Sequence, residues 1–202
     1  MEQIKDSYLT IEGDAEAIFK EKSSKFLCYA FHVESEEEIA ACLEPLRKRY
    51  YDATHHCYAW RLGAFGEKFR ANDDGEPSST AGKPILGQLL SREVTNCLIV
   101  VVRYFGGIKL GTSGLIQAYK AAAAEAIAAA EVIEKTVDDD VEVAFEYPFM
   151  NDVMRIVKEE EPQIVSQSYD MDCLMRLRIR RSMMPRLHER LSKVETLRFV
   201  EE

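Results

Sequence analysis

The sequence lacks any long hydrophobic run. No apolar stretch in its 202 residues approaches the roughly 18 residues that a membrane-spanning helix needs. Its first six residues have neither the basic start nor the apolar core of a secretory signal peptide. We therefore expect a soluble, cytoplasmic protein with no membrane partner.

Closely spaced cysteine pairs are missing as well. The five cysteines are odd in number, widely spaced and mostly set in apolar segments, so they are predicted to be reduced core thiols. No Cys-x-x-Cys pair is present, which argues against a zinc site. We predict no metal and no cofactor. The cysteines are Cys28, Cys42, Cys57, Cys97 and Cys173.

Basic residues are outnumbered by acidic ones. Lysine and arginine number 26 against 35 aspartates and glutamates, giving a formal net charge of −9. This balance argues against a protein that coats DNA non-specifically, because such binding needs a broad basic surface. A local basic patch stays open. Hydrophobic residues make up 47% of the chain, which is enough to bury a core.

The first part of the chain has the pattern of a mixed α/β domain. Ser35 precedes apolar residues at helical spacing and Glu38 has the capping-box position, which predicts a helix over 35–50. Pro45 either weakens this prediction or kinks the helix. The other expected elements are strands over 24–33, 56–62, 67–71 and 97–102 and helices over 81–90 and 115–131.

Three successive aspartates, 138–140, mark a break in composition, after which the pattern restarts. The later elements are expected to be strands over 141–147, 164–170, 173–181 and 197–201 and helices over 148–160 and 183–194. Their order is βαββαβ, which is typical of ferredoxin-like folds. We therefore expect an α+β protein of two domains, an N-terminal α/β domain over 1–136 and a ferredoxin-like domain over 137–202.

Two polar, glycine-punctuated runs flank the apolar strand over 97–102. In the second run, over 103–114, glycines permit close backbone approaches just before a helix whose first amides lack internal partners. Such a loop can hold an anion, although a tight strand-to-helix connection is an equally good interpretation. The predicted anion-binding residues are Arg103, Gly106, Gly107, Lys109, Gly111, Thr112 and Ser113. Their spacing matches neither a P-loop nor a dinucleotide fingerprint.

The first run, over 73–84, carries three acids in four residues. Asp73, Asp74 and Glu76 have the oxygen ligands of a Mg²⁺ site or the carboxylates of a general base. Turn chemistry is the favoured interpretation, with Ser78 to Thr80 capping the helix that begins near Ala81.

His55 and His56 begin the strand that precedes this run. Adjacent strand residues point to opposite faces, so only one histidine is expected to face a given site. The predicted partner surface combines this strand with the acidic run. It consists of His55, Arg61, Asp73, Asp74, Glu76, Ser78, Thr80 and Lys83.

Three arginines share one face of a strand in the second domain. Arg176, Arg178 and Arg180 alternate with apolar residues on what is often the uncovered face of a ferredoxin-like sheet. They are candidate nucleic-acid contacts, but no aromatic pair accompanies them to stack bases. Cross-strand ion pairs with Glu142 and Glu146 are the stronger interpretation.

The polar motifs together resemble the IMPACT/YigZ family, in its bacterial two-domain form. The resemblance rests on residues 52–55, 57–59, 61–63, 74–78, 80–82 and 103–111. It implies an N-terminal domain similar to domains of ribosomal proteins and elongation factors, followed by a ferredoxin-like domain. For eukaryotic relatives it implies translational control through a partner of a stress-responsive initiation-factor kinase.

Three functional hypotheses follow, and no catalytic residue is predicted for the first of them. The first is a non-enzymatic binding protein that regulates translation by contacting RNA, the ribosome or a translation-related protein. The second is a small-molecule enzyme, a hydrolase or phosphoryl-group catalyst, that uses His55, Asp74, Glu76 and Ser78. The third is a protein-interaction module whose acidic run contacts a basic partner. The sequence leaves the oligomeric state open.

Overall fold

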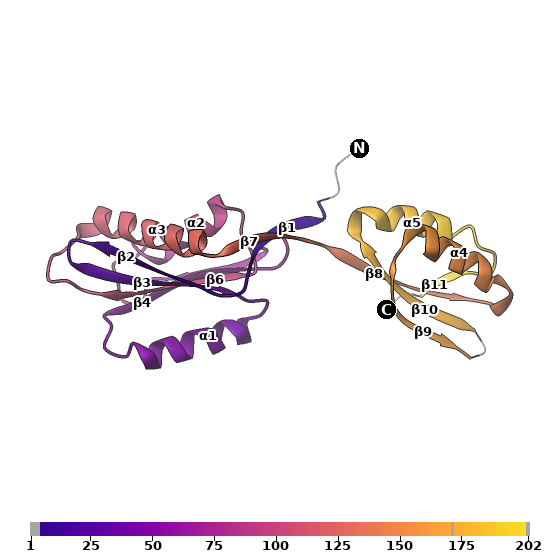
Figure 1. The fold of residues 1–202 in the computed structure, drawn as a ribbon, viewed down its shortest axis with the longest axis horizontal. Helices are drawn as coiled ribbons and strands as arrows, with labels where there is room; N and C mark the ends of the chain where they lie inside the picture. Colours follow the sequence, from indigo (N-terminus) through magenta and orange to yellow (C-terminus); the bar gives the residue numbers. More distant parts are fainter. Residues whose placement is uncertain (1–4, 171, 201–202) are drawn as a thin grey trace. The chain divides into compact units, whose positions relative to one another are not determined.

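A computed structural model describes residues 5–170 and 172–200 of the chain. It divides into an N-terminal unit of residues 8–135 and a C-terminal unit that begins at residue 136 and includes residues 5–7 (Figure 1). Within these described ranges, no helix is long and apolar enough to cross a membrane.

The N-terminal unit is built on a five-stranded antiparallel sheet. The strands, in sheet order, are β2 (Ala15–Glu21), β3 (Ser24–His32), β6 (Cys97–Tyr104), β4 (His55–Leu62) and β5 (Lys68–Asn72). The central strand β6 is the apolar stretch that the sequence marks as buried. A separate pair joins β1 (Ser7–Glu12) to β7 (Glu131–Thr136). The sequence pattern did not predict β1, β2 or β7.

Helices cover both faces of this sheet. Helix α1 (Glu36–Arg49) lies on one face, and α2 (Gly82–Ser91) and α3 (Gly111–Ala129) lie on the other (Figure 1). Alternation along β6 serves both cores, since Val100 packs on the α1 side and Val101 on the α2 and α3 side. The predicted start of α1 is confirmed, because the backbone N–H of Glu38 donates to Ser35 Oγ over 3.2 Å.

Helix α3 begins one turn earlier than predicted. The expected start was residue 115, but Gly111 already opens the helix, so residues 111–114 form its first turn and not a loop. Gly111 has a φ of +72°, a conformation that side chains rarely adopt. Gly106 serves close packing, since a Cβ there would lie 2.1 Å from the backbone carbonyl of Ser23. The strand-to-helix connection therefore explains part of the glycine pattern.

The C-terminal unit confirms the ferredoxin-like order. Its antiparallel sheet has the order β11-β8-β10-β9, and α4 and α5 cover one face (Figure 1). Its elements are β8 (Asp138–Phe145), α4 (Met150–Glu160), β9 (Gln163–Tyr169), β10 (Cys173–Arg180), α5 (Met184–Leu191) and β11 (Arg198–Val200). The predicted α+β class is also confirmed.

Candidate functional site

A buried ion pair lies where β6 ends. Arg103 Nη1 donates to Glu76 Oε1 over 2.5 Å, and both residues are buried, with exposed fractions of 5% and 8%. Tyr119 of α3 donates its hydroxyl to the same oxygen over 2.7 Å. The guanidinium also lies over the rings of Phe26 and Phe105, 5.6 and 5.7 Å from their centroids. Because Glu76 offsets its charge, Arg103 is less suited to bind a phosphate than its sequence position indicates.

His55 stands beside this pair on the neighbouring strand, opposite Arg103 in the register of β4 and β6. Its Nδ1 lies 2.7 Å from the backbone carbonyl of Asp74, so Nδ1 carries the hydrogen and donates. Its Nε2 then lies 3.8 Å from Glu76 Oε2. His56 is buried, and this burial lowers the pKa of its imidazole below the ordinary value.

Asp73 folds the acidic run and caps α2. Its Oδ1 accepts the backbone N–H groups of Ala81 and Gly82 over 3.0 and 2.8 Å, and its Oδ2 accepts that of Ser79 over 2.8 Å. The cap thus comes from Asp73 and not from the predicted run of Ser78 to Thr80. Thr80 is buried and its hydroxyl donates to the Pro77 carbonyl over 2.6 Å.

Asp74 is also occupied by protein donors. Its Oδ2 accepts the backbone N–H of His56 over 2.6 Å, and its Oδ1 accepts Arg47 Nη2 over 3.3 Å. These bonds support turn chemistry over Mg²⁺ coordination at the acidic run. Among the described residues, no cluster of three or more His, Cys, Asp or Glu side chains could hold a metal ion.

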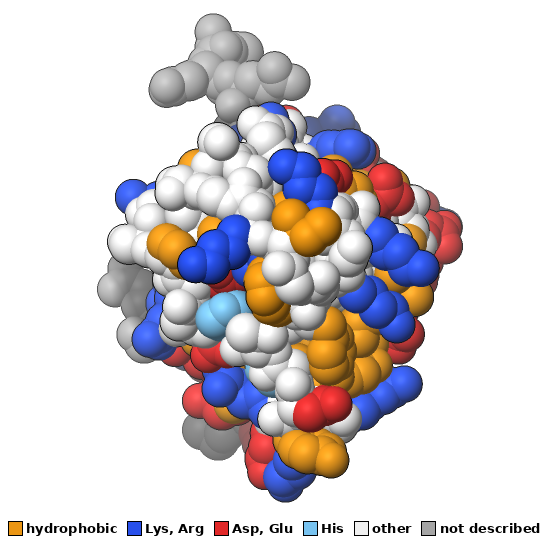
Figure 2. Space-filling view, turned by 90° about the vertical axis from the view of Figure 1, so that its left-hand side faces the viewer, with side chains coloured by type: hydrophobic (Ala, Val, Ile, Leu, Met, Phe, Trp, Pro, Cys, Tyr) orange, Lys and Arg blue, Asp and Glu red, His pale blue; other side chains and the backbone are white. Residues whose placement is uncertain are grey.

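The two polar runs meet at one cavity of about 380 Å³. Most of its lining is apolar, while His55, Glu76 and Arg103 lie within it and Lys109 and Thr112 are exposed at its rim. The lining residues are Thr54, His55, Glu76, Pro77, Arg103, Phe105, Lys109, Leu110, Gly111, Thr112 and Leu115. Figure 2 shows one end of the molecule, where the basic side chains of the described residues are scattered among hydrophobic, acidic and other groups.

Other predicted site residues lie outside this cavity. Arg61 stands at the far end of β4, where its guanidinium donates to the carbonyls of Val94 and Phe65 over 3.0 and 3.3 Å. Burial lowers the pKa of that guanidinium. The structure thus gives Arg61 a role in holding the turn after β4. The predicted residues that do not line the cavity are Arg61, Asp73, Asp74, Ser78, Thr80, Lys83, Gly106, Gly107 and Ser113.

The arginines of β10 are engaged by acids. Arg176 and Arg178 donate to Asp140 over 3.1 and 2.6 Å, and Arg180 donates to Asp6 over 2.5 Å. Hydrogen bonds from Arg178 hold the pKa of Asp140 below its ordinary value. Ion pairing is therefore present, although with these partners in place of the expected Glu142 and Glu146.

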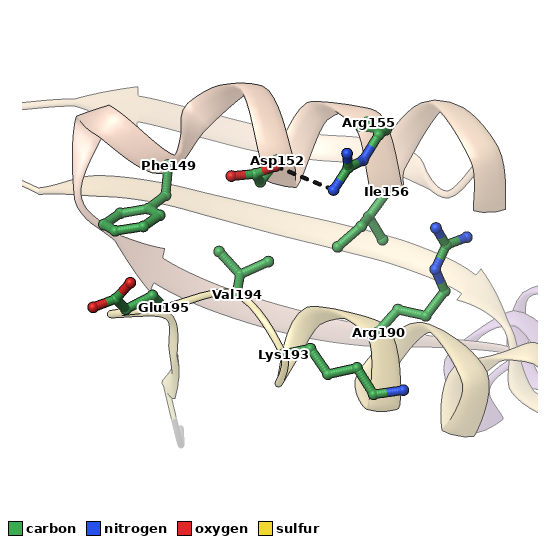
Figure 3. A pocket seen from close by; sticks show the side chains of 8 residues that line it. All are labelled: Phe149, Asp152, Arg155, Ile156, Arg190, Lys193, Val194 and Glu195. Carbon is green, nitrogen blue, oxygen red and sulfur yellow. Dashed lines mark hydrogen bonds and ion pairs between the residues drawn. The ribbon is translucent and has the colours of Figure 1, made fainter.

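A second cavity, of about 450 Å³, lies between α4 and α5 in the C-terminal unit (Figure 3). Each of its cations has an acidic partner. Arg155 donates to Asp152 over 3.1 Å, as the dashed line in Figure 3 marks. Lys193 donates to Glu189, and Arg190 donates to Glu159 and Glu160. This cavity therefore offers less uncompensated charge than the N-terminal one.

Sequence reasoning missed the apolar side of the N-terminal cavity and its link to α3. Tyr119 follows Leu115 by four residues, so the two share a helix face, and this spacing was the available signal. The missed lining residues are Thr54, Pro77, Phe105, Leu110 and Leu115.

Comparisons with known proteins match this chain to one family. A family model described as the Impact N-terminal domain matches residues 22–127. The IMPACT family member YigZ of Escherichia coli (strain K12) is 33% identical over 174 residues, which cover 85% of this chain and 85% of that protein. The IMPACT family member YvyE of Bacillus subtilis (strain 168) is 34% identical over 155 residues, covering 77% and 71%. A crystal structure of a hypothetical protein matches 98% of this chain and 100% of its own, with 30% identity and a TM-score of 0.73.

Proposed function

This chain belongs to the IMPACT family, and from that premise we propose that it is a non-enzymatic binding protein that acts on translation by contacting RNA. Family membership supplies the link to translation. The resemblance of the N-terminal domain to domains of ribosomal proteins and elongation factors supports ribosomal RNA as the surface contacted. A ribosomal or other translation-related protein is the alternative partner that the binding test distinguishes.

The observation that carries this proposal is the rim of the N-terminal cavity. Lys109 is exposed there and forms no ion pair or hydrogen bond with the described residues. The amides of Gly111 and Thr112 belong to the first turn of the 19-residue helix α3, where backbone N–H groups lack intrahelical acceptors. With Arg103 offset by Glu76, Lys109 and this helix end provide the positive potential. Phosphate binding at such a place follows from the same electrostatics.

The test is a salt titration of RNA binding and of ribosome binding. The Lys109→Ala variant should bind more weakly, and the slope of log affinity against log salt should fall by about one, as expected for one lost phosphate contact. Lys120→Ala is the matched control, because Lys120 is an exposed lysine of the same helix away from the cavity.

Failure of the wild type to bind either RNA or ribosomes would overturn the proposal. Equal effects of the two lysine substitutions would remove the cavity rim as the contact. Binding to ribosomal proteins without RNA would identify the alternative partner instead.

The orientation of His55 favours a second candidate, a small-molecule enzyme. The bond from its Nδ1 to the Asp74 carbonyl makes Nε2 of the neutral ring an acceptor that lies beside the cavity, as a general base requires. Asp74 and Ser78 do not line the cavity, so the predicted catalytic set is reduced to His55 and Glu76. Turnover of phosphorylated metabolites that His55→Gln abolishes would support this candidate, and complete inertness of the wild type would eliminate it.

A further inference from the structure

The N-terminal cavity holds two acceptor atoms that receive no hydrogen bond from the described residues when the His55 ring is neutral. Glu76 Oε1 accepts both Arg103 and Tyr119, whereas Oε2 accepts no hydrogen bond from the described residues. His55 Nε2 lies 3.8 Å from Oε2, and in the neutral ring with its hydrogen on Nδ1 it is a second acceptor. Both side chains are largely buried, with exposed fractions of 3% and 17%. A ligand with two N–H donors on one nitrogen satisfies both acceptors.

The remaining walls define the rest of that ligand. Pro77, Phe105, Leu110 and Leu115 provide an apolar lining suited to a flat ring, and a volume of about 380 Å³ is in the range of small-ligand sites.

The rim favours negative charge on a ligand bound there. Lys109 and the N-terminal turn of α3 lie at the mouth, where an anion is stabilised by both. The ligand thus combines an amino group, a flat ring and an anionic group in that order from the floor outward.

We propose that this cavity binds a single nucleotide whose base carries an exocyclic amino group, with the amino group between Glu76 and His55 and the phosphate against Lys109 and the start of α3. The inference rests on the proposed function and deepens it, since RNA supplies such a nucleotide wherever a base is unstacked. Stacked bases of a duplex cannot enter a cavity of this kind. A free mononucleotide presents the same chemistry, and the experiment separates the two sources.

The test compares ligands that differ in one group, by calorimetric titration of the full chain. AMP should bind about tenfold more tightly than IMP, and CMP than UMP, because the second member of each pair replaces the amino group with a carbonyl. Adenosine and inorganic phosphate, each lacking one half of AMP, should bind more weakly than AMP. A short oligoadenylate that binds more tightly than AMP identifies RNA as the source, and equal affinity identifies the free nucleotide.

Two exposed positions of α3 give a matched pair of variants. Thr112→Trp places a bulky ring at the cavity mouth and should lower AMP affinity by about tenfold or more, whereas Gln117→Trp, away from the cavity, should leave it unchanged. Because both positions are exposed, neither substitution disturbs the core, and thermal unfolding checks that both variants are folded.

Absence of saturable AMP and CMP binding, or AMP binding that Thr112→Trp leaves intact, would overturn the inference. Equal affinity for AMP and IMP would overturn the placement of the amino group. The proposed function fails separately: RNA binding that Lys109→Ala weakens and Thr112→Trp leaves unchanged would support that function and exclude the nucleotide site.

Discussion

Arginines beside carboxylates occur in both units of this protein, but their surroundings differ. Arg103 in the N-terminal unit is buried with Glu76. Its guanidinium lies over two aromatic rings, and the Glu76 carboxylate accepts the Tyr119 hydroxyl. Arg178 in the C-terminal unit keeps 45% of its side chain exposed while it pairs with Asp140. An arginine–carboxylate ion pair is thus desolvated in the N-terminal unit and hydrated in the C-terminal unit.

This difference decides what each arginine contributes. An exposed pair is screened by water and contributes little to stability. Removal of one partner from a buried pair is strongly destabilising, because it leaves the other charge buried and unpaired. Burial of Arg103 and Glu76 also leaves Glu76 Oε2 without a hydrogen bond from the described residues, on a side chain that lines the cavity. The buried pair is therefore structural and at the same time shapes the candidate binding site.

Removal of Glu76 should produce the largest effect. Glu76→Ala leaves the Arg103 guanidinium buried without its carboxylate, and the free energy of unfolding of the N-terminal unit should fall by about 3–5 kcal/mol. Urea denaturation measures this loss, and Asp140→Ala in the other unit should cost far less. Similar losses for the two variants would contradict the comparison.

A substitution at Gly106 tests the close packing near Arg103. Gly106→Ala forces a Cβ to within 2.1 Å of the Ser23 backbone and should lower the free energy of unfolding by about 1–3 kcal/mol. Gly87→Ala, inside α2 with no atom within 4 Å of the new Cβ, should raise it by about 0.5–1 kcal/mol. Thermal or urea unfolding should show these opposite signs, and two destabilised variants would be inconsistent with the packing described.

A smaller effect is expected from the tyrosine that supports Glu76. Tyr119→Phe removes a buried hydroxyl donor to Glu76 Oε1 and should lower the free energy of unfolding by about 1–2 kcal/mol. Tyr104→Phe removes a bond to Asp52 that is exposed to water, so its effect in the same urea titration should be smaller. The reverse order would show that burial does not set the contribution of these bonds.

The pH dependence of the exposed pairs should be the weakest effect. Hydrogen bonds from Arg178 lower the pKa of Asp140 in the folded state, so this pair stabilises the C-terminal unit above the ordinary pKa of aspartate. That contribution should be lost as the pH falls below about 4 and through the lowered pKa. Urea denaturation across this range should show a smaller acid loss for Asp140→Asn, and identical acid losses would exclude a role for the pair.

Hydrophobic periodicity predicted the interiors of helices and strands better than helix ends and edge strands. The alternation in β10 and the helical spacing in α4 identified the ferredoxin-like unit. The first turn of α3 was missed because Gly111 and Gly114 are poor helix formers, and tertiary packing overrides that preference. Strand β2 at the sheet edge has three exposed residues among its seven, which weakens its signal.

The candidate site was predictable in its residue types but not in its distances. His55, Glu76, Arg103 and Lys109 were identified from sequence, and the structure brings all four to one cavity. Arg61 was misplaced because six residues along a strand separate it from His55 by about 20 Å. That Glu76 would neutralise Arg103 depends on a contact between distant segments, which no local pattern encodes.

The central claim is that the N-terminal cavity, and not the arginine face of β10, is the binding site for RNA. RNA affinity measured against salt for Lys109→Ala and Arg178→Ala tests this claim most directly. We predict that Lys109→Ala weakens binding and lowers the salt slope by about one, while Arg178→Ala, whose guanidinium is already paired with Asp140, leaves both unchanged. Loss of binding in Arg178→Ala with wild-type behaviour of Lys109→Ala would contradict the account.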